Sequence, residues 1–193
     1  MRWLRQVYNL VSGRHRYYRG SGRNKTDGKK GLRIQKVAKS IQSIENLLEE
    51  HSFFKGLDPA YLKLIAGCGS NVRFNGSDYI FREGQAADHF YIIRYGKVAL
   101  EFSSPSRGPI TIETVSEGDV LGWSWLYPPY KWFLDARAIN VVRAVALDGK
   151  CLREKCEDDP SLGFELMKRF SYIIAQRLQG TRLRLLDLYG EGN

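Results

Sequence analysis

The stretch of sequence that decides the fold is IFREGQAADHFYIIRYG, from Ile80 to Gly96. The turn signal EGQAAD precedes the apolar run FYII, and Gly96 follows it. A short apolar run bounded by turn residues is typical of a buried β-strand. The spacing therefore predicts a strand from His89 to Tyr95 with a turn on each side.

Further strands extend from this stretch in both directions. Downstream, Val98, Leu100 and Phe102 alternate with polar residues, which is the two-residue period of a half-buried strand. Shorter apolar segments follow in PITIET, VLGW, ARAIN and VRAVAL, and we expect the last two to form one more pair of strands. About eight strands with Gly-rich turns, flanked by helices, predict a mainly β fold of the jelly-roll or β-roll type.

Helical signals lie on both sides of these strands. Ser40 is a candidate cap for a helix with Ile41, Ile44, Leu47 and Leu48 on one face. Asp58–Pro59 marks the start of a second helix, which we expect Gly67 or Gly69 to end in a left-handed conformation.

A long amphipathic helix is predicted over residues 161–188, after Asp159 as cap and Pro160 as first residue. Its apolar residues recur at steps built mostly from threes and fours: Met167, Phe170, Ile174, Leu178, Leu185 and Leu188. This stripe is long for one small roll, so we expect a homodimer through this C-terminal helix. Packing of the whole helix on its own roll is the alternative.

Charge divides the chain into two regions. Residues 1–40 hold 12 of the 30 Lys and Arg but only one of the 21 Asp and Glu. The remaining 153 residues therefore hold 18 basic and 20 acidic side chains, so the high isoelectric point describes only the first region. We predict a basic, disordered arm over residues 1–40 and a folded domain over residues 41–193.

The basic arm has two functional interpretations beside that of a solvated tail. Its Gly-, Arg- and Tyr-rich sequence could stack on single-stranded nucleic acid or lie on an anionic membrane. Nucleic-acid and membrane contacts are expected only through residues 1–40. No apolar run reaches the about 20 residues needed to span a bilayer. A cytoplasmic protein is therefore expected.

The sequence displays no catalytic or metal constellation. Cys68, Cys151 and Cys156 match no zinc spacing, and the expectation for them is idle thiols in a reducing compartment. Cys151 and Cys156 fall on different faces of a short helix, which disfavours a redox pair between them. His51 and His89 have no partner at metal-ligand spacing. We predict a protein that is not an enzyme.

The order of helices, eight strands and a long final helix resembles the cyclic nucleotide-binding domain of Crp/Fnr-type regulators and protein kinase A regulatory subunits. The stretch Ile80–Gly96 carries the first motif of that family, with Gly84 and Gly96 at the turns. Phe81 stands where a smaller apolar residue is usual. The resemblance covers residues 45–188 and implies a β-roll sensor domain with a dimerisation helix.

The second family motif is the phosphate-binding cassette, which stands here as LGWSWLYPPYKWFLDARA, from Leu121 to Ala138. Leu121, Gly122 and Leu126 fit the family pattern. Trp123 falls where the family has the Glu that accepts from the ribose hydroxyl, and Trp132 falls where it has the Arg that binds the cyclic phosphate. Phe133 and Leu134 replace a small residue and an alanine.

This altered cassette predicts a changed ligand site. Losing both charge-assisted contacts costs about 3–6 kcal/mol, so ordinary cyclic AMP binding is not expected. The candidate pocket residues are Gly122, Trp123, Ser124, Trp125, Lys131 and Trp132. Two interpretations stay open: the aromatic residues line a site for a cyclic nucleotide or another small aromatic or anionic ligand, with Lys131 as the anion contact, or they fill the cavity themselves.

The function predicted from these observations is a non-enzymatic regulatory module that signals through dimer and protein-partner contacts. The five residues after Leu188 are too few for the helix-turn-helix that follows this helix in Crp/Fnr-type transcription factors. The alternative is a regulator that binds nucleic acid through its basic N-terminal arm.

Overall fold

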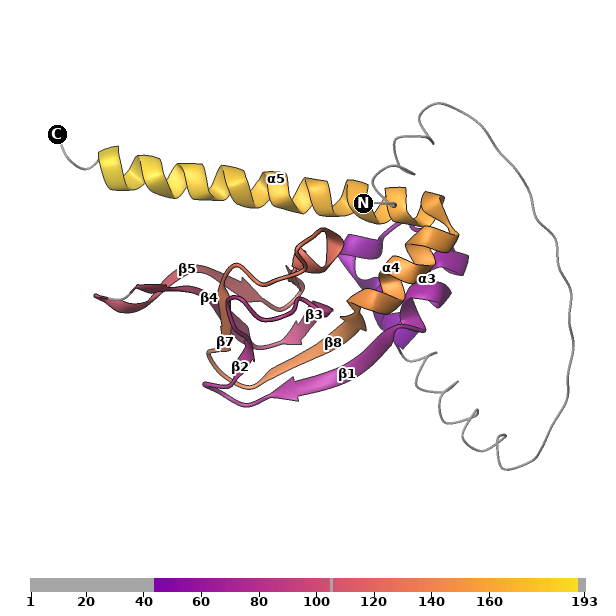
Figure 1. Ribbon diagram of the computed structural model, residues 1–193, viewed down its shortest axis with the longest axis horizontal. Coiled ribbons are helices and arrows are strands. Elements are labelled where there is room, and N and C mark those ends of the chain that lie inside the picture. Colours follow the sequence, from indigo (N-terminus) through magenta and orange to yellow (C-terminus); the bar gives the residue numbers. More distant parts are fainter. Residues whose placement is uncertain (1–43, 105, 191–193) are drawn as a thin grey trace, which may run out of the picture. The chain divides into compact units, whose positions relative to one another are not determined.

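The computed structural model describes residues 44–104 and 106–190 of the chain (Figure 1). The expected arm over residues 1–40 and the expected Ser40 cap therefore lie outside the described residues. The chain divides into two compact units, with the boundary in the described part between Lys155 and Cys156.

In the described part of the chain, three short helical elements precede the strands. A helix over residues 44–50 buries Ile44 and Leu48, and it is followed by the 3-10 helix η1 (Ser52–Phe54) and by α3 (Pro59–Ala66). The predicted start of α3 is confirmed, because Asp58 Oδ1 accepts a hydrogen bond from the Ala60 N–H at 2.8 Å. The predicted left-handed end is wrong: Gly67 has φ −62° and α-helical geometry.

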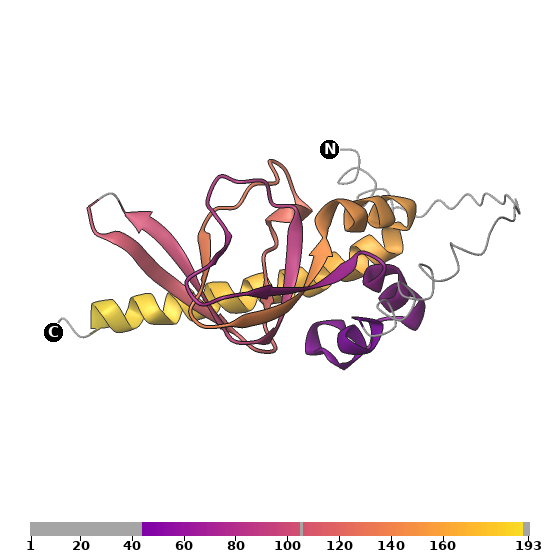
Figure 2. The same ribbon diagram turned by 90° about the horizontal axis from the view of Figure 1, so that it is seen from below.

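Eight antiparallel strands form two four-stranded sheets, as the sequence predicted. Sheet A has the order β1-β8-β3-β6 and sheet B the order β2-β7-β4-β5. Figure 2 shows the strands curving around a common interior. The strand bounds are β1 (Gly69–Phe74), β2 (Tyr79–Phe81), β3 (His89–Tyr95), β4 (Lys97–Ser104), β5 (Gly108–Ser116), β6 (Val120–Leu121), β7 (Asp135–Ala138) and β8 (Val142–Asp148).

The expected pairing of the ARAIN and VRAVAL segments is wrong. β7 pairs with β2 and β4 in sheet B, whereas β8 pairs with β1 and β3 in sheet A. The chain crosses from one sheet to the other between Ala138 and Val142. Both segments carry the apolar alternation of a strand, but alternation alone does not identify the partner strand.

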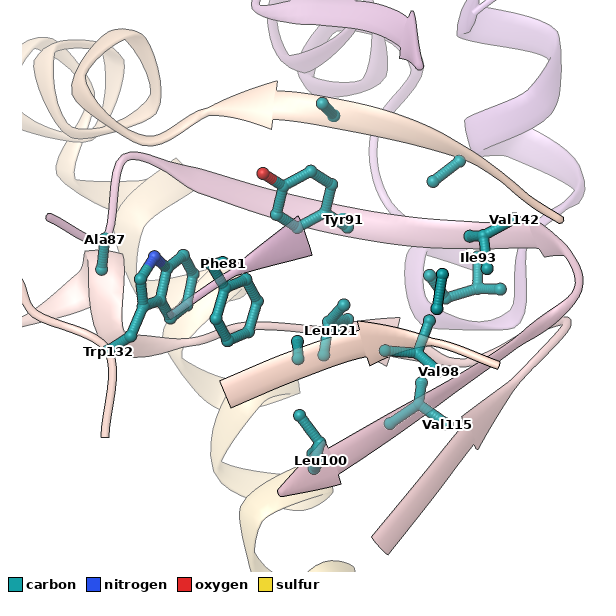
Figure 3. Packing of buried hydrophobic residues seen from close by; sticks show 14 residues of the cluster. Phe81, Ala87, Tyr91, Ile93, Val98, Leu100, Val115, Leu121, Trp132 and Val142 are labelled. Atoms are coloured by element: carbon teal, nitrogen blue, oxygen red, sulfur yellow. The ribbon is translucent and has the colours of Figure 1, made fainter. Parts of the chain in front are cut away.

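The inner faces of the two sheets enclose one apolar cluster, which we call the roll interior. Its members are Phe81, Ala87, Tyr91, Ile93, Val98, Leu100, Val115, Leu121, Trp132, Ala136, Ala138, Val142, Ala144 and Ala146 (Figure 3). Small alanines on β7 and β8 share this cluster with the large aromatic side chains of Phe81, Tyr91 and Trp132.

A second apolar group, which we call the outer layer, lies on the opposite face of sheet A. Phe90 is the neighbour of inward-facing Tyr91, so its side chain points the other way. There its ring lies 5.3 Å from that of Phe53 and 6.4 Å from that of Trp125, and Phe53 packs edge-on against Phe54 at 4.8 Å. This layer attaches the N-terminal helices to the roll.

A disulfide joins Cys68, at the start of β1, to Cys151 in the first turn of α4 (Gly149–Asp158). The expectation of idle thiols is therefore wrong for these two residues, and only Cys156 is a free, buried thiol in the described part of the chain. The pair meets because β1 and β8 are neighbours, and the Asp148 N–H donates to the Cys68 carbonyl at 2.9 Å. A separation of 83 residues gave no local signal for this contact.

The long C-terminal helix α5 runs from Pro160 to Gly190, close to the predicted range (Figure 1). Asp159 Oδ1 accepts from the N–H groups of Ser161 and Leu162 at 3.0 and 3.4 Å, which confirms the predicted cap. No helix in the described part of the chain is both long and apolar enough to cross a bilayer.

Candidate functional site

The loop that follows β6 contains all six candidate pocket residues, and it is tied to the turn between β2 and β3. The Ala87 N–H donates to the Tyr130 carbonyl at 2.7 Å, and the Gly84 N–H donates to the Trp132 carbonyl at 2.8 Å. In return, the Trp132 N–H donates to the Gln85 carbonyl at 3.0 Å. These backbone groups are satisfied by the chain itself and hold the loop in one position.

Trp132 lies inside the roll. Only 5% of its surface is exposed, and its ring stacks on Phe81 of β2 with ring centroids 3.8 Å apart and planes 10° apart (Figure 3). Its far edge covers Gly122, where a Cβ atom would lie 2.7 Å from Trp132 Cη2. Only glycine leaves room for the ring at this position, and its φ of 87° also favours glycine.

Trp125 belongs to the outer layer. It is 1% exposed, stacks near Phe90, and is the central residue of the 3-10 helix η2 (Ser124–Leu126). From α4, Arg153 Nη1 donates to the Trp125 carbonyl at 2.8 Å, and the same guanidinium lies 4.5 Å from the centre of the Tyr130 ring. Trp125 therefore connects this loop to α4.

The structure thus brings only part of the candidate set together. Gly122 and Trp132 are in contact, whereas Trp125 faces another layer. Ser124 is buried in η2, and Trp123 precedes η2 in a half-buried position. Lys131 is exposed, and its backbone forms an isolated β-bridge with Ala86.

Phe81 contacts Trp132 but was not among the candidate pocket residues predicted from the sequence. It is the stacking partner of Trp132, and its ring also lies near that of Tyr91 at 6.3 Å. The contact could have been suspected because both positions depart from the family pattern, with an unusually large residue at position 81 and a tryptophan at position 132. In the structure these two side chains stack on each other.

Tyr91 is the residue with a hydroxyl group among the three neighbouring rings of Phe81, Tyr91 and Trp132. Burial raises the pKa of Tyr91 to about 12, and the negative charge of Asp88 adds to the effect. The phenol therefore stays neutral at physiological pH. His89 stacks on the same ring at 5.8 Å. The interior around Trp132 thus presents aromatic faces and the neutral phenol of Tyr91.

A charged network on the other face of sheet B was also missed. Glu101 is buried on β4, and its carboxylate accepts hydrogen bonds from Nε and Nη2 of Arg137 on β7. These hydrogen bonds lower the pKa of Glu101 and raise the pKa of Arg137. Asp135, also buried, accepts from the Glu83 N–H at 2.7 Å and pairs with Arg82 at 3.6 Å. Both carboxylates are therefore paired with an arginine of the same domain.

Comparison with known proteins places this fold and loop in a family. The model of the cyclic nucleotide-binding domain matches residues 71–159. A solved structure of a putative cyclic nucleotide-binding protein from Geobacter metallireducens is 33% identical in sequence, with a TM-score of 0.63, and the match covers 70% of this chain and 98% of that one. This chain belongs to the cyclic nucleotide-binding domain family.

Other members of the family show how widely the domain is used. A CRP-like cAMP-activated global transcriptional regulator of Mycobacterium tuberculosis is 27% identical over 145 residues, which are 75% of this chain and 63% of that protein. The chain thus spans less than two thirds of that relative. The regulatory domain of Toxoplasma gondii PKA, solved with cAMP, has the same fold with a TM-score of 0.64 at 19% identity, covering 77% of this chain and 56% of that one.

The correspondence of Leu121–Ala138 to the phosphate-binding cassette, with Trp123 and Trp132 at the family's Glu and Arg positions, stays a prediction. The two tryptophans take different places in the structure. Trp132 enters the roll interior, and Trp123 remains half-buried beside η2. The loop Gly122–Leu134 contains one basic residue, Lys131, and no carboxylate.

Proposed function

We propose that this cyclic nucleotide-binding domain is a regulatory module whose roll is closed by its own aromatic side chains, so that it signals through protein contacts without binding cAMP in the family's usual manner. The observation that carries the proposal is the position of Trp132. Its ring is buried against Phe81 and Gly122, and the resemblance aligns this residue with the family's phosphate-binding arginine.

The first argument is chemical. A guanidinium binds a cyclic phosphate through two parallel, charge-assisted hydrogen bonds, and an indole ring offers a single neutral N–H. Together with the Trp123 replacement, this change removes about 3–6 kcal/mol of binding free energy, or a factor of about 10²–10⁴ in affinity.

The second argument is steric. The stack of Trp132 on Phe81 and the close approach of Trp132 to Gly122 occupy the inner side of the cassette. A ligand there would have to displace a buried tryptophan and would lose the packing of its ring in the interior. Both arguments favour the interpretation in which the aromatic residues fill the cavity.

A homodimer through α5 is part of the proposal. The apolar stripe of this helix is buried at Phe170, which is 1% exposed, but it is exposed at Ile174 and Leu178. Tyr172, Leu183 and Leu186 are also exposed, but they lie on the opposite face of the helix. Exposed apolar side chains in a regular helix are typical of a surface that a second helix covers. A partner copy would bury the face that carries Ile174 and Leu178.

The proposal is tested by thermal unfolding of the full chain with and without millimolar cAMP or cGMP. The PKA regulatory domain of Toxoplasma gondii, whose structure was solved with cAMP, serves as the positive control. A ligand at a hundredfold excess over its Kd stabilises the folded state by about 2.7 kcal/mol, which raises the midpoint by about 5–10 °C. We expect such a shift for the control and none for this chain.

A saturable shift of the native chain would contradict the proposal. In that case the variant Lys131→Ala decides how the phosphate is held, because Lys131 is the one cation of the cassette loop. Loss of the shift in that variant would assign the anion contact to Lys131.

A further inference from the structure

We propose that the exposed face of sheet A carries a docking surface for an acidic helix of a partner protein, formed by three arginines in a row across neighbouring strands. The row consists of Arg73 on β1, Arg143 on β8 and Arg94 on β3, and all three are exposed. The proposal extends the proposed function, since it gives the chemistry of one partner.

The strand register places the three side chains side by side. Arg73 is directly opposite Arg143 in the β1–β8 ladder. In the β3–β8 ladder, Ile93 pairs with Ala144 and Tyr95 pairs with Arg143, so the register shift leaves Arg94 beside the same Arg143. Neighbouring strands are about 4.8 Å apart, and the row therefore crosses three strands within about 10 Å.

Two observations show that the row lies on one face, outside the roll. Ile93, Val142 and Ala144 belong to the roll interior, so the residues that alternate with them point outward. In addition, Arg94 Nη1 donates to Asn71 Oδ1 at 3.3 Å, and this contact reaches from β3 across β8 to β1. Such a contact is only feasible when Arg94 lies over the outer face of β8.

The charges of the row are not neutralised by the domain itself. Arg73 donates a hydrogen bond to Asn75 Oδ1 at 2.9 Å, and Arg94 donates to Asn71 Oδ1. Both acceptors are neutral side-chain amides. Within residues 44–104 and 106–190, none of the three guanidinium groups forms an ion pair. Like charges placed directly opposite in a ladder destabilise a sheet. The domain therefore carries an unfavourable arrangement that an acidic partner would relieve.

An acidic helix fits this surface better than a nucleic acid or an anionic membrane does. Carboxylates three and four residues apart on a helix are about 5–6 Å apart, close to the spacing of the row. Residues 41–193 carry 18 basic and 20 acidic side chains, and this small negative excess disfavours adhesion to an extended polyanion. Tyr95, which is 54% exposed, adjoins the row, and tyrosine with arginine is typical of protein interfaces.

The test measures binding of a fluorescent probe by anisotropy with the full chain at low ionic strength. The probe is an Ala-rich helical peptide of about 18 residues with glutamates at successive third and fourth positions. A peptide of the same composition with scattered glutamates controls for spacing. A single-stranded DNA oligonucleotide and vesicles containing anionic lipid are measured in parallel.

We expect the spaced peptide to bind the native chain most tightly among these probes. The variant Arg73→Glu/Arg94→Glu/Arg143→Glu should lower that affinity at least about tenfold. The matched variant Lys63→Glu/Arg107→Glu/Lys150→Glu changes the net charge equally at exposed positions elsewhere, and its affinity should stay within about twofold of native.

Three outcomes would overturn the proposal: no binding of the spaced peptide, tighter binding of DNA or vesicles that the triple variant abolishes, or an equal loss of peptide affinity in the matched variant. If the triple variant does not fold, Arg143→Gln removes the central charge alone. It should lower peptide affinity about threefold without lowering the thermal midpoint, because it also relieves repulsion from Arg73. The two proposals can fail separately. Absence of peptide binding would not change the expected result of the cAMP experiment, and binding of cAMP would not remove the arginine row from the surface.

Discussion

The roll interior and the outer layer both contain a deeply buried tryptophan from the same loop, but they are held together by different forces. Around Trp132 the neighbours are aromatic and aliphatic, with Phe81 and Gly122 in direct contact. Around Trp125 the packing is joined by Arg153, which donates to its carbonyl, and by the nearby Cys68–Cys151 disulfide at the start of α4.

Because of this difference, we expect the outer layer, but not the roll interior, to respond to ionic strength, redox state and pH. Apolar packing in the roll interior does not depend on ionic strength, redox state or moderate changes of pH. A disulfide, a guanidinium contact and the half-buried His51, whose ring lies 6.3 Å from that of Phe54, each respond to one of these conditions. The outer layer, which contains all three kinds of contact, is therefore the part of the domain where conditions can alter the attachment of the helices to the roll.

The largest expected effect comes from emptying the interior. Trp132→Ala should lower the free energy of unfolding by about 3–5 kcal/mol, because it leaves a cavity against Phe81 that the sheets cannot collapse to fill. Urea unfolding of native and variant chains measures the loss, which should be the same with and without a thiol reductant.

Phe133→Ala is the matched control for this change. Phe133 is the next residue in the chain but is exposed, so its replacement should alter the unfolding free energy by less than about 0.5 kcal/mol. A loss below about 1 kcal/mol for Trp132→Ala would mean that its ring does not fill the interior, and would weaken the proposed function as well.

A smaller loss is expected from cutting the covalent tie in the outer layer. Cys68→Ser/Cys151→Ser should lower the unfolding free energy by about 2–5 kcal/mol, since the disulfide restricts the unfolded chain. Reductant should produce a similar loss in the native chain and none in this variant. Cys156→Ser, which removes the free thiol, should keep the response to reductant; an identical response in all three proteins would contradict the assignment.

The smallest effect concerns His51, which caps η1 by accepting from the Phe53 N–H at Nδ1. Burial lowers the pKa of His51, and the charge of Asp119 opposes this only in part. The unfolded chain therefore binds the proton more readily, and stability should fall as the pH drops below about 6.5.

Urea unfolding at successive pH values from neutral to mildly acidic tests this expectation. The variant His51→Asn keeps an acceptor for the Phe53 N–H without a titrating ring, so its stability should vary less over the same range. An unchanged pH dependence in the variant would assign the effect to other groups.

Local patterns were sufficient for most of the elements. The strand His89–Tyr95, the helix starts at Asp58–Pro59 and Asp159–Pro160, and the number of strands all follow from alternation, capping and turn residues. The cassette position of Trp132 rests on the family motif and stays a prediction. The sequence could not show where its ring lies, since that depends on Phe81, fifty-one residues earlier in the chain.

The sequence by itself determined the β-roll class and the starts of the helices at Asp58–Pro59 and Asp159–Pro160, because these depend on neighbouring residues and on spacing along the chain. Only the tertiary structure decided three further features: the Cys68–Cys151 disulfide, the stack of Trp132 on Phe81, and the row of arginines across β1, β8 and β3. Each of them joins residues that are distant in sequence. Their contact depends on which strands become neighbours and in which register, and that choice is made by the whole chain when it buries its apolar faces together.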